Sequence, residues 1–173
     1  MLTDALARRL PNAIPNAFPV QSKENNIIAN GNFINGLKGW KIWKNPSSLE
    51  IKTDIHNMND NVHTNNKYVT LHKNGQGTGG LQTFFPVYSG SVYIVSAMLR
   101  KTDENNVANG TLGFYMAGTK APCIQIKKLS DVWSHKKLTY NCQNNGVVTV
   151  YVHLDENTGQ SSLDVTDIKC IRE

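Results

Sequence analysis

The sequence predicts an all-β protein, a two-sheet jelly-roll sandwich that follows an extended N-terminal arm. Three observations support this prediction: short runs of alternating apolar and polar residues, Gly- and Asn-rich turns between them, and no long helical periodicity after residue 20. Alternation with a period of two places every second side chain on the same face of a strand. Many short strands separated by turn signals are typical of sandwiches and jelly rolls.

The expected strands occupy the chain from residue 48 to residue 171, with turn signals such as ENNVANG, CQNNG and ENTGQ between them. The runs are SLEIKTDI (48–55), KYVTLHK (67–73), LQTFFPV (81–87), SVYIVSAML (91–99), TLGFYMAG (111–118), VWSHKKLTY (132–140), GVVTVYVHL (146–154) and SLDVTDIKCI (162–171). The run 91–99 is nearly apolar throughout, as expected of a strand buried between two sheets.

Residues 1–25 differ from the rest of the chain, and we expect them to form a docking arm. A short helix with leucines on one face comes first, and Pro11 ends it. Prolines at every fourth residue of PNAIPNAFP then hold the chain extended. Such a segment has little of its own to pack against, so we expect it to lie along a partner; a frayed tail or linker is the alternative. The expected docking residues are Leu2, Leu6, Leu10, Ile14 and Phe18.

Composition excludes some classes of partner. The 173 residues carry a formal net charge of +5, but the lysines and arginines are spread along the chain, so we expect no nucleic-acid partner. The sequence contains no run of 18 apolar residues, so no membrane-spanning helix is expected. Arg8 and Arg9 follow a short apolar run instead of preceding it, which is not the pattern of a signal peptide. We therefore expect synthesis in the cytoplasm without export by the general secretory route.

The three cysteines, Cys123, Cys142 and Cys170, lie far apart and form no C-x-x-C pair, so no zinc site is expected. An odd number argues against a fully paired disulfide framework. A bond between Cys142 and Cys170 is open, but we expect buried free thiols.

The stretch NIIANGNFINGLKGW, residues 26–40, resembles the opening strand of carbohydrate-binding modules of the jelly-roll, galactose-binding-like class. These modules often begin with Asn and two apolar residues, followed by Asn-Gly-x-Phe, Gly-Leu and Gly-Trp. Three later runs, VYIVSAMLRKT, DVWSHKKLTY and LDVTDIKCI, are similar to further strands of the class in the same order. The resemblance spans about Asn26 to Ile171 and implies a galactose-binding-like jelly roll over residues 26–173.

This resemblance also implies roles for single residues. In that class the opening motif is mainly structural, so Phe33, Trp40 and Trp133 are expected in the core. Many members hold a structural calcium near the opening motif and the closing strand, where the ion takes carboxylate and carbonyl oxygens. The matching acids are Asp164 and Asp167, whereas Ile34 replaces a common glutamate. A structural calcium is left open, and no other cofactor is expected.

Sugar sites need aromatic faces for the C–H surface of the ring and polar groups for the hydroxyls. In GVVTVYVHL, the apolar row Val148, Val150, Val152 and Leu154 leaves Thr149, Tyr151 and His153 on the opposite face. Tyr115 likewise points away from the apolar row of its strand. If their strands are neighbours in one sheet, such residues line one concave face; the alternative is that they simply cover a sheet surface. The expected glycan-binding residues are Trp43, Arg100, Tyr115, Tyr151 and His153.

The sequence has no G-x-S-x-G and no H-E-x-x-H motif, and we expect no catalytic activity. A carbohydrate-binding jelly roll made in the cytoplasm, with a docking arm, fits a phage virion protein. We therefore expect a multi-copy structural protein, anchored to capsid or tail proteins by residues 1–25, with weak adhesion to cell-surface glycans. The alternative is a polysaccharide-binding module of a bacterial carbohydrate-degrading system, acting outside the cell or at its surface.

Overall fold

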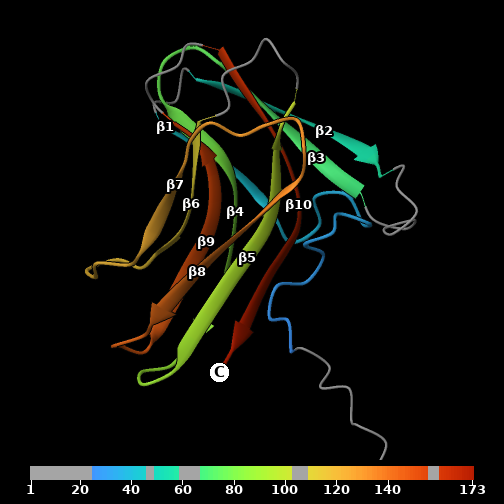
Figure 1. The fold of residues 1–173 in the computed structure, drawn as a ribbon. Helices are drawn as coiled ribbons and strands as arrows, with labels where there is room; N and C mark the ends of the chain where they lie inside the picture. Colours follow the sequence, from blue (N-terminus) through green and yellow to red (C-terminus); the bar gives the residue numbers. More distant parts are fainter. Residues whose placement is uncertain (1–24, 46–48, 59–66, 103–108, 156–159) are drawn as a thin grey trace, which may run out of the picture.

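Two five-stranded antiparallel sheets pack face to face in this protein (Figure 1). The computed structural model describes residues 25–45, 49–58, 67–102, 109–155 and 160–173. The strands are β1 (Lys41–Asn45), β2 (Glu50–Asn57), β3 (Lys67–Asn74), β4 (Thr78–Val87), β5 (Val92–Lys101), β6 (Gly110–Tyr115), β7 (Cys123–Ile126), β8 (Ser134–Asn141), β9 (Gly146–Leu154) and β10 (Gln160–Arg172). The first sheet has the order β1-β4-β9-β6-β7, and the second sheet has the order β2-β3-β10-β5-β8.

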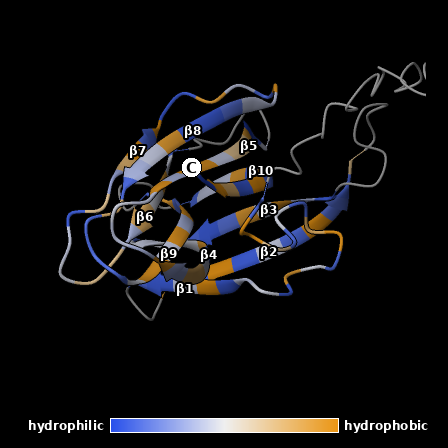
Figure 2. Ribbon diagram, turned by 90° about the horizontal axis from the view of Figure 1, so that it is seen from below, coloured by the Kyte–Doolittle hydropathy of each residue, from blue (hydrophilic) through white to orange (hydrophobic). Residues whose placement is uncertain are grey.

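Eight of the ten described strands coincide with the runs whose alternation predicts them, whereas β1 and β7 were not expected. Residues 26–40, which resemble an opening strand, form turns and irregular structure that lead into β1. The row Val148, Val150, Val152 and Leu154 of β9 is fully buried. Leu112 and Phe114 of β6, and Met116 directly after it, extend the same core, as their spacing predicts. Figure 2 views the two layers end-on and shows apolar and polar residues alternating along the strands. Each fully buried apolar side chain of this size contributes roughly 1.5–3 kcal/mol. The all-β jelly-roll prediction is confirmed.

The opening stretch builds one end of the core. Phe33 is fully buried and Trp40 nearly so, with ring centroids 5.5 Å apart, which confirms their expected role. The indole Nε1–H of Trp40 donates to the carbonyl of Asn30 at 3.2 Å. Gly31 lies so close to β10 that a Cβ there would be 1.8 Å from the carbonyl oxygen of Ile168. No other residue type fits this approach.

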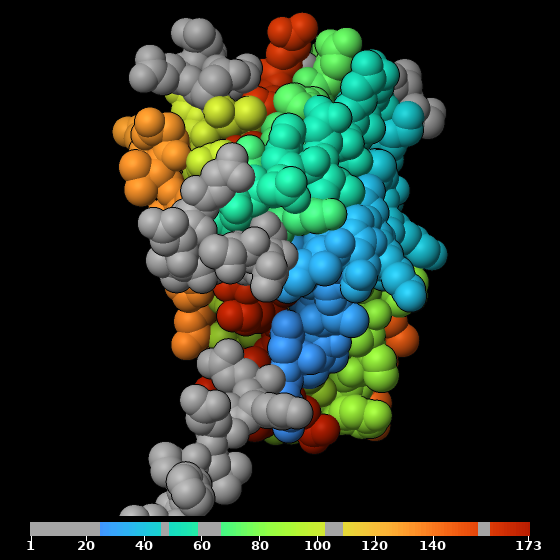
Figure 3. Space-filling model, turned by 90° about the vertical axis from the view of Figure 1, so that its right-hand side faces the viewer, coloured from blue at the N-terminus to red at the C-terminus, as the bar shows by residue number. Residues whose placement is uncertain are grey.

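The chain after residue 25 lies against the C-terminal strand, as the blue and red segments of Figure 3 show. The backbone N–H of Ile27 donates to the carbonyl of Cys170 at 2.7 Å, and the N–H of Cys170 donates to the side-chain oxygen of Asn26 at 2.9 Å. These bonds join the first described segment of the chain to the end of β10. Residues 1–24, and with them Leu2, Leu6, Leu10, Ile14 and Phe18, lie outside the described residues, so the docking arm stays a prediction.

Two expectations about buried residues need correction. Trp133 is only partly buried and packs against Arg100 and Tyr68, so it is not part of the sandwich core. All three cysteines are free thiols, as predicted, and two of them are buried, but Cys123 on the edge strand β7 is exposed. Among the described residues, no helix is long and apolar enough to cross a membrane.

Candidate functional site

The outer face of the first sheet carries a group of aromatic side chains that lie outside the core. Trp43 of β1 pairs with Gly80 of β4, Gly80 pairs with His153 of β9, and His153 pairs with Thr111 of β6. These four residues therefore form one row across the sheet. Because Gly80 has no side chain, the rings of Trp43 and His153 meet over the strand between them.

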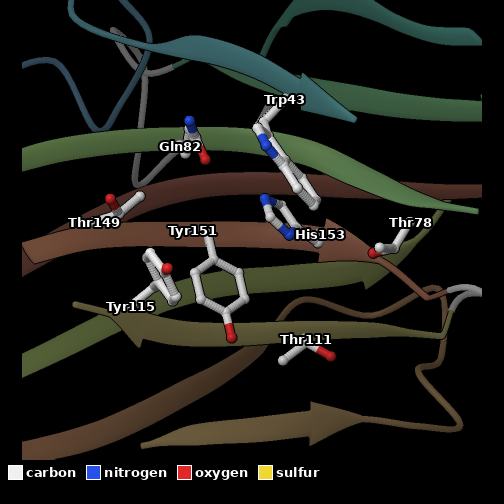
Figure 4. A pocket seen from close by; sticks show the side chains of 8 residues that line it. All are labelled: Trp43, Thr78, Gln82, Thr111, Tyr115, Thr149, Tyr151 and His153. Atoms are coloured by element: carbon white, nitrogen blue, oxygen red, sulfur yellow. The ribbon is translucent and has the colours of Figure 1, made fainter. Parts of the chain in front are cut away.

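A pocket of about 550 Å³ opens on this face (Figure 4). Its lining residues come from β1, β4, β6 and β9: Trp43, Thr78, Gln82, Thr111, Tyr115, Thr149, Tyr151 and His153. The pocket combines large rings with hydroxyl and amide groups, and the lining residues among the described part of the chain include no Asp, Glu, Lys or Arg. Pockets of this size and composition are typical of small-molecule sites.

Three of these rings form a continuous wall. The indole of Trp43 and the imidazole of His153 are stacked, with centroids 4.9 Å apart and planes at 11°. The ring of Tyr151 also lies against the imidazole of His153, with the two ring centroids 4.5 Å apart. Gly113 of β6 makes room for Tyr151, because a Cβ at this position would lie 2.6 Å from the phenol oxygen. The wall thus depends on glycines in β4 and β6.

Burial keeps this wall uncharged. It lowers the pKa of His153 from 6.5 to about 4, so the imidazole is neutral at neutral pH. The His153 Nε2 atom is buried and has no hydrogen-bond partner among the described residues. Burial, with Cys123 and Asp155 nearby, raises the pKa of Tyr151 to about 12, so its hydroxyl remains a donor. The hydroxyl of Thr111 donates to the carboxylate of Asp155 at 2.8 Å.

The structure brings most of the predicted glycan-binding residues together. Trp43, Tyr115, Tyr151 and His153 line the one pocket described above. Sequence reasoning did not select Thr78, Gln82 and Thr111, which also line it. The alternation along their strands could have identified two of them. Thr111 and Gln82 each stand next to a buried, inward-facing leucine, so their own side chains face outward.

Arg100 does not join them, and the expectation that it shares their face is wrong. It lies on β5 in the second sheet. Its Nε donates to Asp164 at 2.8 Å, and its guanidinium lies over the rings of Trp133 and Tyr68, at 4.6 and 5.0 Å from their centroids. The sequence places Arg100 at the end of a strand, but it does not indicate which sheet that strand joins.

The two acids considered for calcium have partners within the protein. The buried carboxylate of Asp164 accepts hydrogen bonds from Arg100, Thr70 and Thr102. Asp167 forms an ion pair with Lys169 at 3.2 Å. In the described residues, no group of three or more His, Cys, Asp or Glu side chains is placed to hold a metal ion. The hydrogen bonds account for the buried charge of Asp164 without a metal.

The sequence matches no protein-family model and no curated protein sequence. Similar solved structures include the carbohydrate-binding module TmCBM61 in complex with β-1,4-galactotriose, at 14% identity and a TM-score of 0.60 over 86% of this chain and 99% of that one. A Stig cyclase from Fischerella sp. TAU has 11% identity and a TM-score of 0.64 over 86% and 96% of the two chains.

The enzymatically active domain of tailspike protein 4 from bacteriophage CBA120 is also similar, at 8% identity and a TM-score of 0.62 over 86% of this chain. The matched region spans 21% of that tailspike chain. At such identities the likeness concerns the fold alone. The chain therefore has a jelly-roll fold like that of carbohydrate-binding modules, a fold that also occurs in a cyclase and a phage tailspike.

Proposed function

We propose that this protein is a non-catalytic carbohydrate-binding protein that holds a glycan in the pocket on the outer face of the first sheet. The observation that supports this proposal is the wall of three rings, Trp43, His153 and Tyr151, beside a floor of polar side chains. The apolar C–H face of a sugar packs on aromatic rings, and its hydroxyls need donors and acceptors around the rim.

The polar residues of the pocket suit such a ligand. The amide of Gln82 offers two donor hydrogens and an acceptor oxygen, and the hydroxyls of Thr149 and Tyr151 both donate and accept. The lack of charged side chains in the described lining favours sugars whose contacts are hydroxyl groups. It also argues against glycoside hydrolysis, which most often uses a pair of carboxyl groups.

A glycan array tests the proposal. Wild-type protein should bind at least one class of glycan, and Trp43→Ala and Tyr151→Ala should each weaken that binding about tenfold or more, because each removes a ring from the wall. Tyr88→Ala is the matched control, since Tyr88 is an exposed aromatic residue on the turn after β4, against Arg172 and outside the pocket. The absence of binding across broad panels would contradict the proposal.

For the biological setting, we propose a structural virion protein of a phage, assembled in several copies on capsid or tail proteins and made in the host cytoplasm. The proline-spaced apolar segment within residues 1–25 supports this proposal, and so does the fold shared with a phage tailspike domain. The alternative setting is a bacterial carbohydrate-degrading system, outside the cell or at its surface. The similarity to the carbohydrate-binding module TmCBM61, which covers 99% of that chain, supports the alternative.

Removal of residues 1–25 separates the two settings. In the virion setting, the shortened protein should be absent from purified particles by mass spectrometry, while its glycan binding persists. A full-length variant with Ile14→Ser and Phe18→Ser controls for the loss of length, and it should also fail to enter particles. Incorporation of the shortened protein at wild-type levels would rule out the docking role, and absence of the wild-type protein from particles would favour the bacterial setting.

A further inference from the structure

At one end of the pocket, a further exposed ring lies just outside the lining residues, that of Phe84. Phe84 of β4 pairs with Thr149 of β9, and Thr149 pairs with Tyr115 of β6. Phe84 also follows the pocket residue Gln82 by two positions, so both side chains face outward. Tyr115, Thr149 and Phe84 therefore form one row across three neighbouring strands. Tyr115 and Thr149 line one end of the pocket, and Phe84 extends their row beyond it.

This row has the shape of a trough. Phe84 is 50% exposed and Tyr115 is 60% exposed, while the small side chain of Thr149 lies between them. Strands in a sheet are about 4.8 Å apart, so the two rings rise from backbone positions about 10 Å apart. That spacing leaves room for a sugar ring over Thr149. A single exposed ring is ordinary, but two exposed rings in one row of a sheet, one of them lining an aromatic pocket, are not.

A cation stands at the edge of the trough. Lys41 of β1 places its ammonium group 4.8 Å from the centre of the Phe84 ring. In the part of the chain that the structure describes, Lys41 forms no ion pair with a carboxylate. The ammonium group carries three donor hydrogens. If it moves off the face of the Phe84 ring, a sugar can pack on that ring and accept a hydrogen bond from Lys41.

We propose that the glycan site extends from the ring wall of the pocket through the trough of Tyr115, Thr149 and Phe84 to Lys41 at its edge, so that the ligand is a chain of several sugars instead of a single terminal sugar. The inference rests on the proposed function. Along β9, His153 at the ring wall and Thr149 in the trough are four residues apart, which corresponds to about 13 Å. One sugar ring cannot contact both ends, whereas consecutive sugars of a chain can.

The dependence of affinity on chain length tests this inference. The probes are β-1,4-linked galacto-oligosaccharides and xylo-oligosaccharides from the monosaccharide to the hexasaccharide, measured by calorimetry, and the short and long members of any other class that the array retains. Affinity should rise with length. Phe84→Ala should remove about fivefold to tenfold of the affinity for long members and leave that for the shortest binding member within about twofold. Lys41→Ala should act in the same direction more weakly.

The control for Phe84→Ala is Tyr88→Ala, which removes an equally exposed ring, 51% against 50%, away from this face. This control should not change the dependence on chain length. Affinity that does not rise with length, or an equal loss for short and long members in Phe84→Ala, would overturn the extended site while leaving the pocket in place. Absence of binding to any glycan would overturn the proposed function and this inference together.

Discussion

The indole of Trp43 lies nearly parallel to the imidazole of His153, with ring centroids 4.9 Å apart and an angle of 11° between the planes. The two residues come from β1 and β9, which are separated by β4. Gly80 is the β4 residue between them in the row, and a Cβ at Gly80 would lie 2.2 Å from the carbonyl oxygen of Val152. A glycine in the middle strand thus allows two rings from different strands to form one surface.

The buried imidazole of His153 predicts a pH-dependent stability. Its pKa falls from 6.5 to about 4 on folding, so between these values the unfolded chain binds a proton that the folded chain does not. The free energy of unfolding should therefore rise with pH across this window, by roughly 3 kcal/mol at most, and the contribution should be constant above it. Urea denaturation from pH 4 to pH 7 measures this slope.

His153→Gln removes the titrating group and should flatten the part of the slope that His153 contributes. His135→Gln, at an exposed histidine on β8, controls for the loss of a histidine. A slope that is the same in wild type and His153→Gln would show that burial of this imidazole does not influence stability.

Gly113→Ala should disturb the site without unfolding the protein. The new Cβ would lie 2.6 Å from the phenol oxygen of Tyr151, at the mobile end of a side chain, and 2.7 Å from the Cβ of Cys123 on the edge strand β7. The ring of Tyr151 must therefore move aside, and β7 must shift slightly. We expect glycan affinity to fall about fivefold, with a change in Tm of only a few degrees. Calorimetry and thermal denaturation measure the two effects separately.

The same substitution in a Tyr151→Ala background is the control, because there the methyl group no longer meets a ring. Gly113→Ala should then cause no further loss of affinity. An additional loss of the same size in that background would indicate that Gly113 acts on the site by another route.

Arg100 is expected to stabilise the fold instead of binding sugar. Its guanidinium is the cation beside the buried carboxylate of Asp164, and Arg100→Ala would leave that charge without its ionic partner. Loss of one partner of a buried pair costs about 3–5 kcal/mol, which urea denaturation would detect. Glycan affinity of the folded fraction should stay the same, because Arg100 lies in the second sheet.

A double variant, Arg100→Met with Asp164→Leu, removes both charges and should be more stable than Arg100→Ala. If Arg100→Ala weakens glycan binding as strongly as Trp43→Ala does, without loss of stability, the assignment of Arg100 to the fold is wrong.

The three thiols should differ sharply in reactivity. Cys123 is exposed on β7, whereas Cys142 and Cys170 are buried, and burial raises the pKa of Cys170 to about 12. A thiol reagent should therefore modify one cysteine of the native protein rapidly and all three after denaturation. Cys123→Ser should abolish the rapid phase, whereas rapid modification of Cys170 would contradict its placement in the core.

Much of the fold follows from local pattern. The alternation in β9 predicts that Val148, Val150 and Val152 are buried, and therefore that Tyr151 and His153 face outward, which the structure bears out. This inference needs no knowledge of neighbouring strands, because successive side chains of any strand point to opposite sides. The burial of Phe33 and Trp40 was implied instead by the resemblance of the opening motif to carbohydrate-binding modules.

The sequence by itself thus determined eight of the ten described strands, all but β1 and β7, and the outward direction of most of the candidate site residues. Only the tertiary structure decided which strands are neighbours. Strand pairing is long-range, and alternation contains no information about the partner or the sheet. For this reason Trp43 and His153 meet over Gly80 in the first sheet, whereas Arg100, equally plausible from its sequence position, pairs with Asp164 in the second.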